Sequence, residues 1–305
     1  MNMPTPPTPT PSSHALSTSS PGIEHMSGVI SRFRRFHEEL MIQGNNLCGL
    51  STGLYDLDQM THGFRAGELV VLAGRPAMGK SCLAQNIAIH TAVKLELPVI
   101  YCTLDVNSYD LASRMVRSLA DLGNHNWYLY KNVEDRQRFE SATEILARSP
   151  LYVLDNGRID IKQLCTEIRE HVQRTGAPKL IVVDSLSQIS AGPRTDPYGD
   201  KDTLMILREL KLLAKDLETP LVLTCTLDRR LEERENRRPQ LIDLDYAAEL
   251  EADMVLAIYR EEYYTKELCE VPGVTEIHIL KNPHGPIGVA ILRFLRSVLR
   301  FETIA

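Results

Sequence analysis

Residues 74–81 have the types and spacing of a phosphate-binding loop. They read GRPAMGKS and match the pattern GxxxxGK[ST] without deviation. In such a loop the backbone amides and the dipole of the following helix surround phosphate groups, so the motif predicts a nucleotide site. Lys80 is expected to reach the β- and γ-phosphates, and the Ser81 hydroxyl is expected to bind Mg²⁺. The predicted nucleotide contacts at this loop are Gly74, Arg75, Pro76, Ala77, Met78, Gly79, Lys80, Ser81 and Cys82.

Two aspartates follow other apolar runs and are the candidates for the rest of the chemistry. Asp184 closes the run 180–183 and is predicted to hold Mg²⁺ through water, because a buried aspartate is costly unless it faces a cation or donors. Asp105 closes the run 99–104 and can aim its carboxylate at an attacking water. For each of them, a structural role at the end of a strand is the alternative. The predicted catalytic residues are Lys80, Asp105 and Asp184, and the predicted metal ligands are Ser81 and Asp184.

These residues need a scaffold, and the hydrophobic pattern predicts an α/β fold. Short apolar runs that do not alternate are typical of strands buried on both faces of a parallel sheet. Helical patterns between them indicate βα repetition, with helices on both faces of the sheet. The last part of the chain predicts an antiparallel hairpin, 275–280 and 288–294, joined by a loop at 281–287. The predicted strands are 69–73, 99–104, 151–154, 180–183, 221–224 and 254–259, and the predicted helices include 82–95, 108–122, 161–175 and 203–217.

The chain divides into three predicted regions. Residues 1–25 are rich in Pro, Ser and Thr and contain no Lys or Arg, which excludes a secretory signal or transit peptide and predicts a disordered tail. Residues 26–46 predict an amphipathic linker helix over 28–43 and a hinge at 44–46. The apolar stripe of this helix is expected to pack on its own domain, and docking on a neighbouring subunit is the alternative. Residues 47–305 are expected to form one P-loop domain.

The composition restricts the classes of partner. With 34 Lys+Arg and 40 Asp+Glu the formal net charge is −6, so no global positive field draws the chain to nucleic acid, and any DNA contact must be local. The arginines at 229–238 alternate with acidic residues and predict a solvated ion-pair loop in preference to a nucleic-acid surface. The 6 cysteines form no CxxC pair and predict a reducing, cytoplasmic setting. No apolar run reaches the roughly 18 residues that a membrane span needs.

Several strings, in order, resemble the C-terminal ATPase domain of the DnaB-like replicative helicases, which are hexameric motors with a RecA-like fold. The resemblance implies a mostly parallel sheet, ATP and Mg²⁺ as cofactors, single-stranded DNA as substrate, a homo-oligomeric ring or association with a replicative helicase, and a Mg²⁺-dependent ATPase of the 5′–3′ helicase type. The amino-terminal collar domain of that family has no counterpart in this sequence. The strings are GLSTGLYDLD at 49–58, GRPAMGKS at 74–81, RMVRSL at 114–119, ADMVLAIYREE at 252–262 and HGPIG at 284–288.

This sequence differs from the family at positions that the resemblance makes functional. The catalytic glutamate of the family corresponds to Asp105, the glutamine that senses the γ-phosphate to Thr226, and the arginine finger to Pro283. A DNA-binding segment of the family is replaced around residues 245–247. Arg260 and Lys281 remain as cations that can substitute in part, and both are predicted nucleotide contacts.

Three functions compete on these residues. The first is a cytoplasmic, oligomeric ATPase that acts on single-stranded DNA in replication or a related process. The second is a catalytically weakened paralogue that binds ATP and regulates or joins another helicase ring without unwinding DNA, which the changes at Asp105, Thr226 and Pro283 favour. The third is a RecA-type recombinase or clock-type ATPase of the same fold, which the strings IYREE and HGPIG disfavour.

Overall fold

The computed structural model describes residues 23–43, 47–123, 132–192 and 200–304. The predicted tail therefore lies outside the described residues, except for 23–25, and so does the predicted hinge at 44–46. No helix in these described stretches is both long and apolar enough to cross a bilayer.

The helices are α1 (Met26–Gln43), α2 (Tyr55–Thr61), α3 (Lys80–Ile89), α4 (Ser108–Ala120), α5 (Val133–Arg148), α6 (Ile161–Thr175), α7 (Asp200–Asp216), α8 (Tyr246–Glu251) and α9 (Glu261–Thr265). The strands are β1 (Leu69–Gly74), β2 (Val99–Thr103), β3 (Leu151–Asp155), β4 (Ile159–Asp160), β5 (Leu180–Asp184), β6 (Ile189–Ser190), β7 (Leu221–Thr226), β8 (Met254–Tyr259), β9 (Val274–Lys281), β10 (Gly288–Leu295) and β11 (Arg300–Thr303). A π-helical turn, η1 (His90–Lys94), extends α3, so the helix predicted at 82–95 is an α-helix that ends in a π turn.

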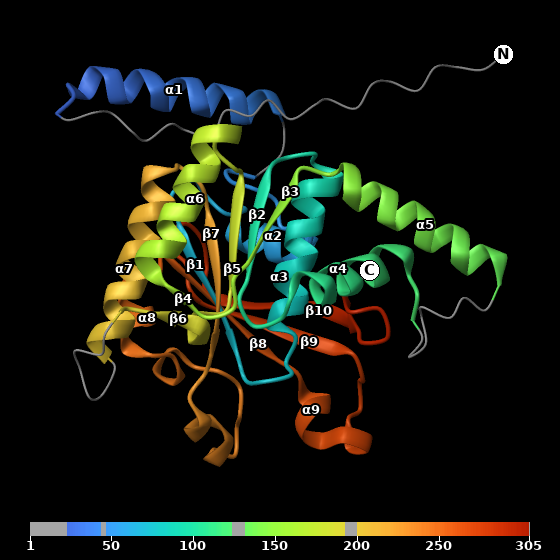
Figure 1. Ribbon diagram of the computed structural model, residues 1–305. Coiled ribbons are helices and arrows are strands. Elements are labelled where there is room, and N and C mark those ends of the chain that lie inside the picture. Colours follow the sequence, from blue (N-terminus) through green and yellow to red (C-terminus); the bar gives the residue numbers. More distant parts are fainter. Residues whose placement is uncertain (1–22, 44–46, 124–131, 193–199, 305) are drawn as a thin grey trace.

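The centre of the molecule is a 9-stranded sheet in the order β11-β10-β9-β8-β1-β7-β5-β2-β3 (Figure 1). The six strands from β8 to β3 are parallel, and β9, β10 and β11 continue the sheet with antiparallel pairing. The predicted parallel sheet with an antiparallel carboxyl-terminal part is thus confirmed. The end of the chain adds a third antiparallel strand, β11, to the two that the sequence predicts, and Lys281 is the last residue of β9 and not the first of the loop.

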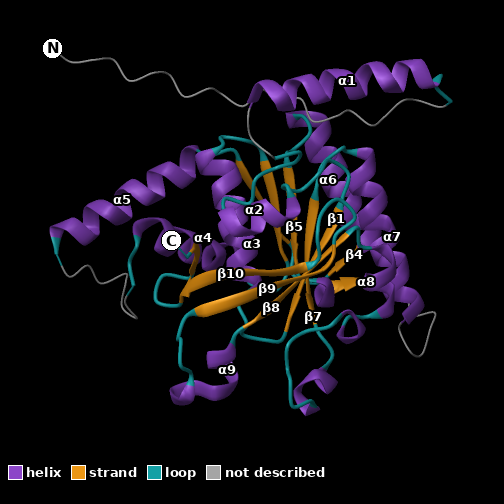
Figure 2. Cartoon of the chain, turned by 180° about the vertical axis from the view of Figure 1, so that it is seen from behind, coloured by secondary structure: helices purple, strands orange, loops and turns teal. Residues whose placement is uncertain are grey.

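Helices cover both faces of the sheet, and each layer closes one apolar core. On one face α6, α7 and α8 pack on alternate residues of β1, β2, β5 and β7. On the other face α2, α3 and α4 pack on the remaining positions of the same strands and on β8, β9 and β10. The figures show these helical layers on opposite sides of the strands (Figures 1 and 2). Side-chain caps fix where helices begin; Asn107, for example, accepts a hydrogen bond from the amide of Asp110 at the start of α4.

The parallel strands end at the same level, and their carboxyl ends form the edge of the sheet at which the site lies. Gly74 at the end of β1 is level with Thr226 of β7 and with Ile258 of β8. In the same way Thr103 of β2 is level with Asp184 of β5. Ligand sites of open α/β sheets lie beyond the carboxyl ends of their strands, so this edge is the place where the predicted residues can meet.

Two expectations about burial are wrong. The sequence predicts that all six runs are buried on both faces, but β3 is an edge strand whose Tyr152 and Val153 are 40% and 44% exposed. The edge position explains the difference, because β3 has only β2 beside it. Most of the described apolar side chains of α1 do not pack on its own domain either: Phe33 and Met41 are 56% and 73% exposed, and Phe36 is partly buried. In both views α1 lies across one end of the molecule, outside the two helical layers (Figures 1 and 2).

Candidate functional site

The loop between β1 and α3 has the conformation that its glycines allow. Gly79 precedes the helix with φ 105, a backbone state that residues with a side chain rarely adopt. A Cβ at this position would also lie 2.9 Å from the ring of Phe301. Ala77 also has a positive φ, of 63. The loop therefore turns tightly and directs the first amides of α3 toward the carboxyl edge of the sheet.

Lys80 lies folded back on this loop. Its Nζ donates to the carbonyl oxygens of Gly74 at 2.9 Å and of Arg75 at 3.2 Å. Burial lowers the pKa of the Lys80 ammonium, because its charged form is partly removed from water. An ammonium held in this way is placed to exchange carbonyl contacts for phosphate oxygens.

The structure brings Ser81 and Asp184 together across the site. The Ser81 hydroxyl donates to Oδ1 of Asp184 at 3.1 Å, although the two residues are 103 positions apart in sequence. Asp184 is 3% exposed. Among the described residues it forms no ion pair, and hydroxyl groups supply its side-chain hydrogen bonds. A buried carboxylate with only neutral donors around it has the donor set that suits a hard divalent cation.

Two further hydroxyls reach Asp184, and the sequence reasoning missed both. The Thr224 hydroxyl on β7 donates to Oδ1 at 2.6 Å, and the Tyr101 hydroxyl on β2 donates to Oδ2 at 3.1 Å. A signal was available in principle, because a hydroxyl inside a buried strand needs a partner. Finding the partner requires the strand order, which places β2 and β7 on either side of β5.

Asp105 lies just beyond the end of β2 and is exposed. Its Oδ1 accepts a hydrogen bond of 3.0 Å from Nε2 of Gln188, a residue that the sequence reasoning also missed. The preceding amide, of Leu104, donates to the backbone oxygen of Asp184 at 2.8 Å. The backbone beside Asp105 is thus fixed against β5, at the same edge as the P-loop.

Arg75 follows β1 and Thr226 ends β7, the strand that lies between β1 and β5 in the sheet. Thr226 is exposed and level with Gly74 in the sheet, so the position of the family's γ-phosphate sensor borders the P-loop. Arg75 turns away from the loop: Nε forms a 2.9 Å ion pair with Glu232, and a terminal nitrogen donates to the Leu227 carbonyl at 2.8 Å. These contacts connect the P-loop to the segment that follows β7.

The structure places the two remaining predicted cations at opposite ends of β8, one at its carboxyl end and one near its amino end. Arg260 follows β8 beside the P-loop and donates to the Ala77 carbonyl at 3.3 Å. Its guanidinium also pairs with Glu262 and lies 4.6 Å from the centre of the Phe294 ring. Lys281 is level with Val255 near the start of β8, at the edge away from this chain's own P-loop.

The Lys281 ammonium makes hydrogen bonds to its own domain at that edge. Its Nζ donates to the carbonyls of Glu249 and Ala252, at 2.9 Å and 2.7 Å, at the end of α8. The following loop, with Pro283, is joined to its own domain, since Asn282 donates to the Met60 carbonyl at 3.0 Å. Lys281 is therefore not brought together with the other predicted nucleotide contacts of this chain, and contact with a nucleotide on a neighbouring subunit stays a prediction.

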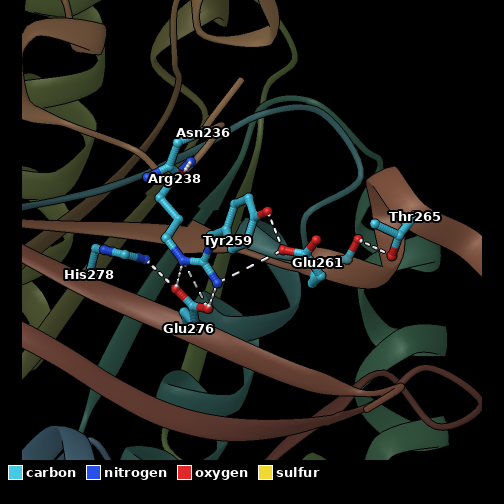
Figure 3. Close-up of polar contacts among 7 residues, drawn as sticks. All are labelled: Asn236, Arg238, Tyr259, Glu261, Thr265, Glu276 and His278. Atoms are coloured by element: carbon cyan, nitrogen blue, oxygen red, sulfur yellow. Dashed lines mark hydrogen bonds and ion pairs between the residues drawn. The ribbon is translucent and has the colours of Figure 1, made fainter. Parts of the chain in front are cut away.

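Among the described residues, two of the five arginines at 229–238 form ion pairs, and their partners lie outside this segment, so the predicted pairing with the interleaved acidic residues is not found. Arg234 forms a 2.6 Å ion pair with Asp243. Figure 3 shows Arg238 against the carboxylate of Glu276, 2.6 Å away, with Glu261 on its other side, and its guanidinium lies 4.9 Å from the centre of the Tyr259 ring. Arg229 and Arg230 are exposed at the start of the segment. The ion pairs connect this segment to Asp243, α9 and β9.

Comparison with known proteins gives one family over most of the chain. The model of the DnaB-like helicase C-terminal domain matches residues 49–303. The replicative DNA helicase DnaC of Bacillus subtilis is 30% identical over 270 residues, which are 88% of this chain and 59% of that protein. The replicative DNA helicase DnaB of Geobacillus stearothermophilus is 31% identical over 270 residues, with the same shares. The chain thus spans 59% of the length of these two relatives.

Solved structures agree on the fold. One of them, an ATPase domain, superposes with a TM-score of 0.84 at 22% identity, over 91% of this chain and 99% of that one. A DnaB-like replicative helicase, whose structure is described together with its interactions with primase, gives 0.82 at 22% identity, over 94% and 68%. The resemblance and the fold that the sequence predicts are both confirmed by these matches.

Proposed function

Because the chain belongs to the DnaB-like helicase C-terminal domain family, we propose that it binds ATP with Mg²⁺ and hydrolyses it while acting on single-stranded DNA, in replication or a related process. The observation that carries this proposal is the convergence of the P-loop, Ser81 and the buried Asp184 at the carboxyl edge of the sheet. The curated relatives are named as replicative DNA helicases.

Different residues of the site would bind the phosphates and the metal ion. The amides of 77–81 and the ammonium of Lys80 would neutralise the β- and γ-phosphates. Ser81 and Asp184 would hold Mg²⁺, and their 3.1 Å contact shows that their oxygens share one small space. Bound there, the metal would neutralise charge on the phosphate oxygens.

Hydrolysis then depends on the residue that directs the water. Asp105 is at the same edge and is exposed, so its carboxylate can accept a proton from water at the open side of the site. The Gln188 amide, which donates to Asp105, holds this carboxylate in one orientation. Thr226 ends β7, beside the P-loop strand, and Arg75 contacts Glu232, so a change at the γ-phosphate would be transmitted to the segment after β7.

An assembled ring, or association with a replicative helicase, is part of the proposal. It is supported by the exposed apolar side chains of α1, among them Ile30, Phe33 and Met41. Lys281 and the loop after it lie at the edge opposite this chain's own P-loop, so any nucleotide that they contact would belong to a neighbouring subunit. Arg229 and Arg230 are exposed cations for a DNA backbone.

The test is steady-state phosphate release with ATP and Mg²⁺, with and without single-stranded DNA, for the natural chain and for Lys80→Ala. The variant loses a charged hydrogen bond to phosphate, so nucleotide affinity should fall about 10-fold to 100-fold. Lys215→Ala, which removes an exposed lysine on α7, is the matched control and should bind nucleotide normally. Turnover that rises with DNA and disappears only in Lys80→Ala would support the motor.

The second candidate is a weakened paralogue that binds ATP and modulates another helicase ring. The replacements at Asp105, Thr226 and Pro283 favour it, because they change the base, the γ-phosphate sensor and the trans-acting cation while leaving the binding residues in place. The same experiment separates the two functions. Tight ATP binding with negligible turnover, with or without DNA, would reject the motor, and DNA-stimulated turnover would reject the paralogue.

A further inference from the structure

Tyr101 is a polar group in a place where packing alone requires none. It lies in the middle of β2, is 0% exposed and is surrounded by apolar side chains of the core that α3 covers. A phenylalanine would fill the same volume. Burial of a hydroxyl costs free energy unless it makes a hydrogen bond, so the phenol oxygen needs a partner.

The strand register explains how Tyr101 reaches its partner. Tyr101 is level with Val182 of β5, and Asp184 is two residues further along the same face of β5. Two residues of a strand advance about 6.6 Å, which the long phenol side chain can span. The hydroxyl thus reaches Oδ2 of Asp184 at 3.1 Å from the side opposite to Thr224.

The proton of this hydrogen bond belongs to the tyrosine. The hydroxyl donates to Oδ2 of Asp184, and a carboxylate oxygen can only accept, so the phenol is the donor of this contact.

Three hydroxyls therefore hold one carboxylate from three directions. Ser81 on α3 and Thr224 on β7 contact Oδ1, and Tyr101 on β2 contacts Oδ2. We propose that Tyr101 is a positioning residue, which fixes the orientation of the Asp184 carboxylate for the metal that accompanies the nucleotide. The inference rests on the proposed function, since it assigns Asp184 to the Mg²⁺ of a bound nucleotide.

The expected consequence is specific to the metal. Without the phenol hydroxyl the Asp184 side chain keeps two donors on one oxygen and can rotate about the bond to its carboxylate. Loss of a group that orients a metal ligand costs about 10-fold to 100-fold in metal affinity. Phosphate contacts made by the P-loop amides and Lys80 do not involve Tyr101 and should keep their strength.

The experiment measures the binding of a fluorescent, non-hydrolysable ATP analogue at increasing Mg²⁺ and, separately, in EDTA. In Tyr101→Phe the Mg²⁺ concentration for half-maximal enhancement should rise about tenfold, while the affinity in EDTA should stay at the natural value. The matched control is Tyr259→Phe on β8, because Tyr259 is also buried and also donates to a carboxylate, that of Glu261. It should leave both measurements unchanged.

The outcomes distinguish a failure of this inference from a failure of the proposed function. If the natural chain binds the analogue and responds to Mg²⁺, but Tyr101→Phe has the same Mg²⁺ midpoint, the inference is wrong and the proposed function stands. If Tyr101→Phe weakens binding in EDTA as much as in Mg²⁺, the tyrosine supports the fold only, and the inference is again wrong. If the natural chain shows no Mg²⁺-dependent binding, the proposed function fails, and the inference fails with it.

Discussion

Asp105 is the residue at which a single methylene can be tested for its effect on catalysis. The resemblance implies that the family carries a glutamate at this position, and we predict that Asp105→Glu accelerates ATP hydrolysis. The backbone cannot move to compensate for the shorter side chain, because the Leu104 amide donates to the Asp184 carbonyl at 2.8 Å. Thr103 is also paired in the sheet, with Asp184 on one side and Asp155 on the other.

The size of the effect follows from this geometry. One carbon–carbon bond is about 1.5 Å long, so an aspartate on a fixed backbone leaves the attacking water that much further from its carboxylate. A general base acts within about 2.6–3.2 Å of the proton donor and contributes about 100-fold to 10,000-fold. The longer side chain also breaks the 3.0 Å contact with Gln188 that orients the base. We therefore expect partial recovery, an increase of about tenfold in kcat, equal to ~1.4 kcal/mol.

The assay is phosphate release at saturating ATP, with the affinity for a fluorescent analogue measured alongside. Asp105→Glu should raise kcat and leave the affinity for nucleotide unchanged, since Asp105 does not belong to the P-loop. Asp105→Asn is the control that removes the base without changing its size, and it should abolish turnover. The reasoning would be refuted if Asp105→Asn hydrolyses ATP as fast as the natural chain, because the water would then be directed by another group.

Two further predictions concern stability. Lys281→Met removes an ammonium bonded to two carbonyls at the end of α8, so it should lower the free energy of unfolding by about 2 kcal/mol and Tm by about 4–8 °C. It should not change nucleotide affinity in the monomer, whereas a loss there would contradict its placement away from the P-loop. Burial raises the pKa of Glu276, but bonds with Arg238 and His278 outweigh it and hold the pKa below its ordinary value. The stabilisation from ionised Glu276 is thus present above about pH 4.3 and lost on acidification, so the Tm difference from Glu276→Gln should shrink toward pH 3; a constant difference would count against it.

The sequence predicts those parts of the molecule that depend on local pattern. The P-loop is a short string with a fixed geometry, and the apolar run 180–183 with an aspartate after it identifies β5 and Asp184. The same patterns are silent about which strands are neighbours, and Tyr101 and Thr224 acquire their meaning only from the order β7-β5-β2. The exposure of β3 cannot be predicted from the sequence either, because an apolar run has the same pattern in a central strand and in an edge strand.

The loop after β9 shows what sequence and structure contribute together. The resemblance assigns the arginine finger to Pro283, so the sequence alone predicts a missing charge. The structure adds that the loop is firmly held: Asn282 bonds to the Met60 carbonyl, and His284 pairs with Glu68 at 2.9 Å. The loop therefore presents a fixed surface at the edge opposite its own P-loop, without the charge that the resemblance implies there. In a ring made only of this chain, each nucleotide would meet a neutral proline from its neighbour. A mixed ring, in which another subunit supplies the cation, would activate the same site without any change in this chain.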